Sequence, residues 1–172
     1  MQIIGLHKNE VKLVPHNPGW DDLFNVEKEK FLSTIGSDIL VEHIGSTAIP
    51  TICAKPVVGI MIGYKNINDI QNIISNLKKI NYIFQKNESP TEPILFIKTN
   101  KTKSLFHLHV TKYNSLQWKY AIGFRDYLNN NLKVAKEYEA LKIELAKKFQ
   151  NDRLAYKKGK EKFILDIYKK II

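Results

Sequence analysis

The densest group of residues suited to chemistry is the run His43-Ile44-Gly45-Ser46-Thr47, which Lys55 follows shortly after. Glycine permits a tight turn, and a Gly-Ser-Thr turn can present backbone N–H groups and two exposed hydroxyls to phosphate oxygens. Lys55 would supply a compensating positive charge. The run lacks the lysine position of a P-loop, and an ordinary turn is the alternative. The pattern predicts an anion-binding turn that, together with Lys55, lines the main cleft.

A second candidate is Phe106-His107-Leu108-His109-Val110, with two histidines at positions i and i+2 of an expected strand. Residues at this spacing share one face, so both imidazoles can reach one phosphate, metal or reacting group. Metal sites need three or four ligands. We expect His43 to face the same cleft, and zinc is a candidate ion there. Two structural histidines are the alternative.

Arg125 is the third candidate, within Phe124-Arg125-Asp126-Tyr127-Leu128. Adjacent residues on a helix point in different directions, so the pattern favours two separate contacts over one Arg–Asp ion pair. Arg125 is a candidate for ligand binding. A further cluster can form an anion-binding rim, although a solvated helix face is the favoured interpretation; it comprises Arg153, Tyr156, Lys157, Lys158 and Lys160.

The elements that must position these residues are mixed in the first two thirds of the chain. A helix is expected to begin at Asn17-Pro18 and to end at Gly36. Apolar spacing predicts a second helix over Ile67–Ile80. Strands are predicted at Ile39–Ile44, Val57–Tyr64, Tyr82–Gln85, Ile94–Lys98 and Leu105–Thr111.

The remainder of the chain, from Ser115 onward, has helical spacing. It includes one long amphipathic helix from Leu132 to Phe149 and a final one marked by Phe163–Ile171. We therefore expect one domain over residues 1–172, in which a sheet-containing part, 1–112, and a helical part, 113–172, share one core.

Composition limits the class of protein. The chain has 172 residues, 44% of them apolar, which suffices for one folded domain. Its apolar runs are shorter than the roughly 20 residues of a membrane span, and its opening residues do not resemble a secretory signal. The single cysteine, Cys53, favours a cytoplasmic location and excludes an internal disulfide. We expect no membrane partner.

Charge is distributed unevenly along the chain. Residues 1–97 carry 9 Lys+Arg and 10 Asp+Glu, whereas residues 98–172 carry 18 and 7. This asymmetry favours an anionic ligand, with the lysine-rich composition of an AT-biased genome as the alternative. Arginine is scarce, so sequence-specific DNA is not an expected partner.

Several of these motifs together resemble the GrpB family. The resemblance rests on VEHIGSTAIPTICAKPVVGIMI, on FHLHV and FRDYL, on Tyr138-Glu139-Ala140-Leu141-Lys142, and on the terminal Tyr156, Lys160, Phe163 and Ile164. The family is regarded as a branch of the nucleotidyltransferase superfamily, and similar domains occur fused to dephospho-coenzyme A kinase. The resemblance implies an α+β fold with a nucleotidyltransferase-like mixed β-sheet, flanking helices and a helical C-terminal half.

The chain departs from the family pattern at one position. Where the family has Lys-Pro, two aliphatic residues and Asp, this chain has Lys55, Pro56, two valines and Gly59, and Met61 occupies the next position that could supply a carboxylate. Magnesium prefers hard oxygen ligands, which neither residue supplies. We expect Gly59 to leave extra room, so that Gly59→Asp would raise magnesium affinity.

The first hypothesis is therefore a cytoplasmic protein that binds a nucleotide or other small phosphorylated ligand without standard metal-dependent nucleotidyl transfer. The predicted ligand-binding residues are His43, Gly45, Ser46, Thr47, Lys55, His107, His109 and Arg125, and no catalytic residue or metal ligand is assigned. The alternatives are an active nucleotidyltransferase with unrecognised metal ligands, and a basic module that binds RNA or a partner protein.

Overall fold

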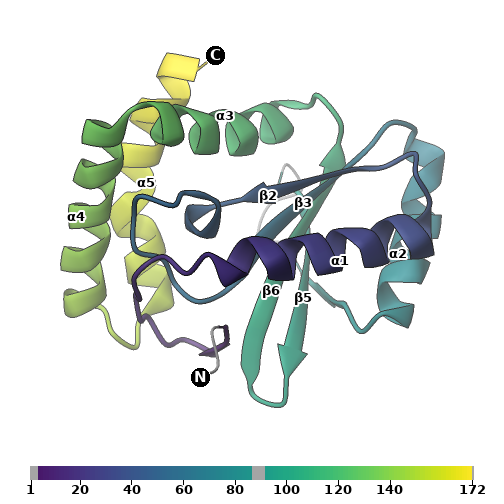
Figure 1. Ribbon diagram of the computed structural model, residues 1–172, viewed down its shortest axis with the longest axis horizontal. Helices are drawn as coiled ribbons and strands as arrows, with labels where there is room; N and C mark the ends of the chain where they lie inside the picture. The colour runs from purple at the N-terminus through teal and green to yellow at the C-terminus, as the bar shows by residue number, and fades with distance from the viewer. Residues whose placement is uncertain (1–3, 87–91, 172) are drawn as a thin grey trace.

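The computed structural model describes residues 4–86 and 92–171 (Figure 1), so residues 1–3, 87–91 and 172 lie outside the described part. The strands are β1 (Leu6–His7), β2 (Leu40–Ile44), β3 (Val58–Tyr64), β4 (Ile83–Gln85), β5 (Ile94–Asn100) and β6 (Lys103–Lys112). The α-helices are α1 (Gly19–Ile35), α2 (Ile70–Lys79), α3 (Leu116–Asn130), α4 (Leu132–Lys148) and α5 (Arg153–Ile171), and the short 3-10 helices are η1 (Ser46–Ala48) and η2 (Ile67–Asp69).

The sheet is mixed and has the order β2-β3-β6-β5-β4, with β1 beside β6. β3 and β6 run parallel, and the other pairs are antiparallel. This arrangement confirms the predicted α+β class. β6, which carries His107 and His109, lies at the centre of the sheet, so both histidines are held by neighbouring strands on either side.

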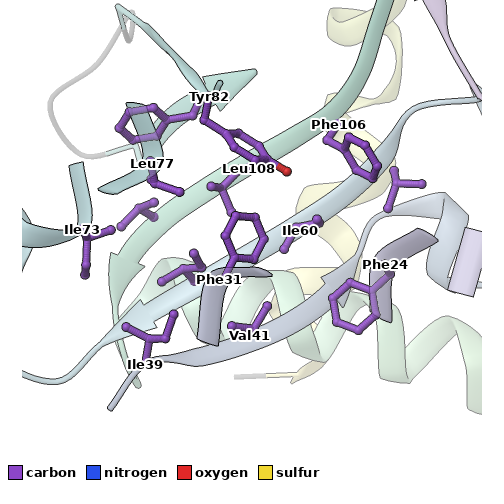
Figure 2. Close-up of a cluster of buried hydrophobic side chains, with 14 of the residues drawn as sticks. Phe24, Phe31, Ile39, Val41, Ile60, Ile73, Leu77, Tyr82, Phe106 and Leu108 are labelled. Carbon is purple, nitrogen blue, oxygen red and sulfur yellow. The ribbon is translucent and has the colours of Figure 1, made fainter. Parts of the chain in front are cut away.

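One face of the sheet is covered by α1 and α2 (Figure 1). α1 begins as predicted: the Asn17 side chain accepts a hydrogen bond from the backbone N–H of Gly19 at 2.9 Å. Its large apolar side chains then lie one or two turns apart and enter the core. Figure 2 shows Phe24 and Phe31 among the residues of this cluster, which include Val41, Ile60, Ile73, Leu77 and Leu108.

The opposite face carries the odd-numbered residues of β3 and β6 and is covered by the C-terminal helices. Trp118 of α3 packs so closely on β3 that a Cβ atom at Gly63 would lie 2.6 Å from its ring. A second apolar cluster joins α3, α4 and α5 to Ile49 and Ile52, which lie in the segment between β2 and β3. No helix within residues 4–86 and 92–171 is long and apolar enough to cross a bilayer.

A buried carboxylate on α1 reaches Tyr82 and Lys98 of β5, which lie on the same face of the sheet. Glu27 is 2% exposed, accepts hydrogen bonds from Tyr82 Oη at 2.9 Å and Lys98 Nζ at 3.0 Å, and pairs with Lys30 at 2.7 Å. Burial raises the pKa of Glu27, but these donors outweigh it and hold the pKa below its usual value. The carboxylate is therefore charged and fully paired at neutral pH.

Candidate functional site

The Gly-Ser-Thr turn lies where β2 ends. Gly45 has φ of 73°, a conformation that favours glycine, and η1 starts at Ser46. Thr47 is 2% exposed, and its Oγ1 lies 3.0 Å from His43 Nε2 and 3.4 Å from the backbone N–H of Gly59. The expectation that both hydroxyls are exposed is wrong for Thr47, because its hydroxyl holds the turn against β3.

His43 does not face the same side of the sheet as the other two histidines. It is paired with Ile60 of β3, which is in turn paired with Leu108 of β6. Paired residues share a face and successive residues alternate, so His107 and His109 face the other way. The prediction that the three imidazoles share one cleft is therefore wrong, and so is a zinc site built from all three.

His43 instead joins α1 to the end of β2. Its Nδ1 lies 3.0 Å from a carboxylate oxygen of Asp21, and its ring stacks on Phe24 with centroids 4.9 Å apart. Burial lowers the pKa of His43, and the Asp21 carboxylate opposes this effect. These contacts give His43 a structural role on the face of the sheet that α1 covers.

Lys55 belongs to a cluster of cations that also contains Lys142, Arg153 and Lys160; Lys142 is buried and the other three are partly buried. Lys55 Nζ and Lys160 Nζ lie 5.5 and 4.7 Å from the centre of the Tyr156 ring. Burial, together with the charges of the other three cations, lowers the pKa of Lys55 to about 7. Burial and Arg153 likewise lower the pKa of Lys160 to about 8. Burying several positive charges close together is energetically unfavourable unless an anion binds among them.

Lys142 connects this cluster to the Gly-Ser turn. It is 1% exposed, its Nζ donates hydrogen bonds to Ser46 Oγ at 3.2 Å and to the carbonyl oxygen of Cys53, and it lies 5.0 Å from the centre of the Tyr138 ring. Burial lowers its pKa to about 8. Lys142 thus donates a hydrogen bond directly to the predicted phosphate-binding turn. The sequence analysis did not predict Lys142 as a site residue.

A repeated pattern could have revealed these lysines. Tyr138 and Lys142 on α4, like Tyr156 and Lys160 on α5, are four residues apart, which places each lysine over the ring of its own tyrosine. A solvated face is the wrong interpretation for most of the predicted rim on α5: Tyr156 is 2% exposed and Arg153 and Lys160 are partly buried, whereas Lys157 and Lys158 are exposed.

His107 borders the cation cluster. Arg153 Nη2 lies 3.4 Å from its Nδ1. Burial, followed by Arg153, Lys55 and His109, lowers the pKa of His107 to about 3, so the ring is neutral at pH 7. Arginine only donates, so Nδ1 accepts and the ring proton lies on Nε2. That Nε2–H is buried and has no hydrogen-bond partner among the described residues. A buried donor of this kind requires an acceptor.

His109 faces a different hollow on the same side of the sheet. Burial lowers its pKa to about 4. The hollow, of about 340 Å³, is lined by Gly45, Met61 and His109 and by the rings of Tyr120, Phe124, Tyr138 and Tyr168. Larger hollows of about 540 Å³ lie elsewhere, and one of them is lined in part by His107 and Arg153. None of these three is lined by Ser46 or Lys55, so the prediction that both line the main cleft is not confirmed.

Arg125 is engaged with protein groups. Its Nη1 donates to Glu42 Oε2 at 2.7 Å and to the carbonyl oxygen of His43 at 2.8 Å, and its Nε donates to Asp126 Oδ1 at 2.7 Å. The expectation of separate Arg and Asp contacts is therefore wrong, because the adjacent pair does form an ion pair. Arg125 fastens α3 to the end of β2.

The residues present do not fit the magnesium site that the fold implies. An added Cβ at Gly59 would lie 2.6 Å from the carbonyl oxygen of Ile44, so the backbone leaves no space for an aspartate. The expectation of extra room at Gly59 is wrong. Glu42, which shares the face of Met61 and His109, is paired with Arg125. Nowhere in the described residues do three His, Cys, Asp or Glu side chains form a metal-binding group.

Comparisons with known proteins agree with this architecture. The family described as GrpB protein matches residues 10–170. The glutamate-rich protein GrpB of Alkalihalophilus pseudofirmus is 36% identical over 170 residues, which cover 96% of this chain and 98% of that protein. The UPF0157 protein YqkA of Bacillus subtilis is 29% identical, over 91% of this chain and 46% of that protein.

Solved structures show the same relationship. The crystal structure of conserved protein GrpB from Enterococcus faecalis matches with a TM-score of 0.83 and 25% identity, over 93% of this chain and 96% of that one. The Cid1 poly(U) polymerase, solved with MgGTP bound, matches with a TM-score of 0.54 and 10% identity, over 78% of this chain and 44% of that one, which is a likeness of fold alone. The family match over residues 10–170 and these relatives show that the chain belongs to the GrpB family.

Proposed function

We propose that this GrpB-family protein binds a small phosphorylated ligand, a nucleotide in particular, on the sheet face that carries His107. The observation that carries the proposal is the cluster of Lys55, Lys142, Arg153 and Lys160. Burial lowers the pKa of all four side chains, and neighbouring cations of the cluster lower the pKa values of the three lysines further. A phosphate group would neutralise this cluster. It would also offer an acceptor to the buried Nε2–H of His107.

A hollow beside the turn supports a nucleotide as the class of ligand. Gly45 lines the aromatic hollow of about 340 Å³, and Tyr138 of that hollow also lies beneath Lys142. Ligand pockets of this kind begin at about 300 Å³ and are lined mainly by apolar and aromatic side chains. An aromatic base in the hollow would therefore place its phosphates toward Ser46 and the lysines.

The test is a thermal-shift panel of nucleotides, coenzyme A precursors and phosphosugars. A ligand at about 100 times its Kd stabilises by about 2.7 kcal/mol. Lys160→Met should abolish the stabilisation by the best ligand, whereas Lys158→Met, on an exposed position of the same helix, should leave it unchanged. If every phosphate-bearing compound leaves the melting temperature unchanged, the proposal fails.

Two further measurements separate the alternatives. Transfer of label from ATP, GTP, CTP or UTP would identify an active nucleotidyltransferase. Affinity for RNA that falls steeply with salt would identify a basic RNA-binding module, since phosphate-backbone binding releases many counterions.

A further inference from the structure

Among residues 4–86 and 92–171, the face that would hold magnesium in a phosphoryl-binding site carries no group of carboxylates suited to it. Phosphate chains in such sites are commonly neutralised by a metal ion that bridges their oxygens, and the ion is held by acidic side chains. Here Gly59 has no side chain, and a Cβ added to it would lie 2.6 Å from Ile44 O, so a carboxylate at this position would require the backbone to shift. Glu42 is within 2.7 Å of Arg125 and so already has a cation.

Cations occupy the space around this face instead. Lys142 reaches Ser46 Oγ at 3.2 Å, Arg153 reaches His107 at 3.4 Å, and Lys55 and Lys160 both approach Tyr156. When protonated, these side chains carry four positive charges. A monophosphate would leave much of this charge unpaired, whereas a di- or triphosphate chain carries about as many negative charges as the cluster has positive ones.

We propose, building on the function proposed above, that the ligand is a di- or triphosphate bound without a metal ion, with the cluster of Lys55, Lys142, Arg153 and Lys160 neutralising the phosphate chain. His107 borders this cluster through Arg153 and keeps a buried Nε2–H that has no partner among the described residues. Magnesium bound to the phosphate chain would bring two positive charges among the lysines. The metal complex of the ligand therefore binds more weakly than the metal-free anion, because repulsion at such short range is strong.

The experiment is isothermal titration of the whole protein with orthophosphate, pyrophosphate, inorganic triphosphate, AMP and ATP, each with EDTA or with excess magnesium chloride. In EDTA we expect pyrophosphate and triphosphate to bind at least about tenfold more tightly than orthophosphate, and ATP to bind at least about tenfold more tightly than AMP. Excess magnesium should weaken the binding of ATP and pyrophosphate by a similar factor. Lys160→Met should weaken pyrophosphate binding, and Lys158→Met should not.

The outcomes distinguish this inference from the proposed function. Tighter binding of ATP or pyrophosphate with magnesium, or AMP binding as tightly as ATP, would overturn the metal-free polyphosphate site and leave phosphate-ligand binding intact. If no phosphate compound binds under either condition, both proposals fail. The comparison with and without magnesium uses the wild-type protein, so it decides the question even if Lys160→Met does not fold.

Discussion

Replacing Lys55 by methionine should stabilise the ligand-free protein below neutral pH. The variant keeps an unbranched side chain of similar length and removes the ammonium from the other cations. The pKa of Lys55 falls from 10.5 to about 7 on folding, and at about 1.4 kcal/mol per pH unit this difference corresponds to a cost of about 5 kcal/mol for the protonated folded state. The lost contact between Nζ and the Tyr156 ring, at 5.5 Å, offsets about 0.5–1 kcal/mol of the gain. These figures set an upper limit of about 4 kcal/mol.

The pH dependence gives the prediction its sign. Below about pH 7 Lys55 is protonated in both states, and the folded state carries the whole cost. Between about 7 and 10.5 the unfolded chain holds a proton that the folded chain has released, so the free energy of unfolding of the wild type rises with pH. The stability advantage of Lys55→Met should therefore be largest at low pH and should shrink as the pH increases.

Urea unfolding at a series of values from about pH 6 to about pH 9 measures this difference. Lys158→Met is the matched control, because Lys158 is exposed on α5. Its stability curve should run parallel to that of the wild type. A Lys55→Met curve that also runs parallel to the wild type, or lies below it at about pH 6, would refute the argument that the cation cluster is strained without an anion.

Three further predictions follow from packing and titration. Gly59→Asp should destabilise the fold by about 1–3 kcal/mol in urea unfolding and should not create a magnesium-dependent thermal shift, because its Cβ would meet the Ile44 carbonyl at 2.6 Å; a stable variant that gains magnesium binding would contradict the steric argument. Glu27→Ala should cost about 3–5 kcal/mol by the same assay, since Lys98 would lose its buried partner, and a loss below about 1 kcal/mol would show that the pair contributes little. Burial lowers the pKa of His109 from 6.5 to about 4, so the free energy of unfolding of the protein should fall as the pH falls from about 6.5 toward 4. His109→Asn should reduce this loss at acid pH, and an unchanged loss would assign it to other groups.

Local patterns in the sequence were enough to predict most of the elements. The start signal of α1 at Asn17-Pro18, the alternation from Leu105 to Thr111 and the glycine turn at Gly45 all depend on residues close together in the chain. Hydrophobic period and capping are properties of such short segments. The α+β class followed from them, and the family resemblance supplied the nucleotidyltransferase-like sheet.

The face of the sheet on which each histidine lies was decided only by tertiary structure. His43 and His107 are both strand residues, but the register through Ile60 and Leu108 places them on opposite faces. A shift of one residue in that register would have reversed the result, because side chains alternate along a strand. No local pattern contains this information.

The spacing of Tyr138 and Lys142 could have drawn attention to this lysine, but it does not show that the lysine is buried. Its position on α4 is compatible with a solvated lysine, and only the approach of α4 to Ser46 and Cys53 encloses its ammonium. The sequence by itself thus determined the secondary structure and the excess of positive charge. The packing of α4 and α5 against one face of the sheet decided which lysines come together, because their charges meet only after segments about 90 residues apart in the chain are brought into contact.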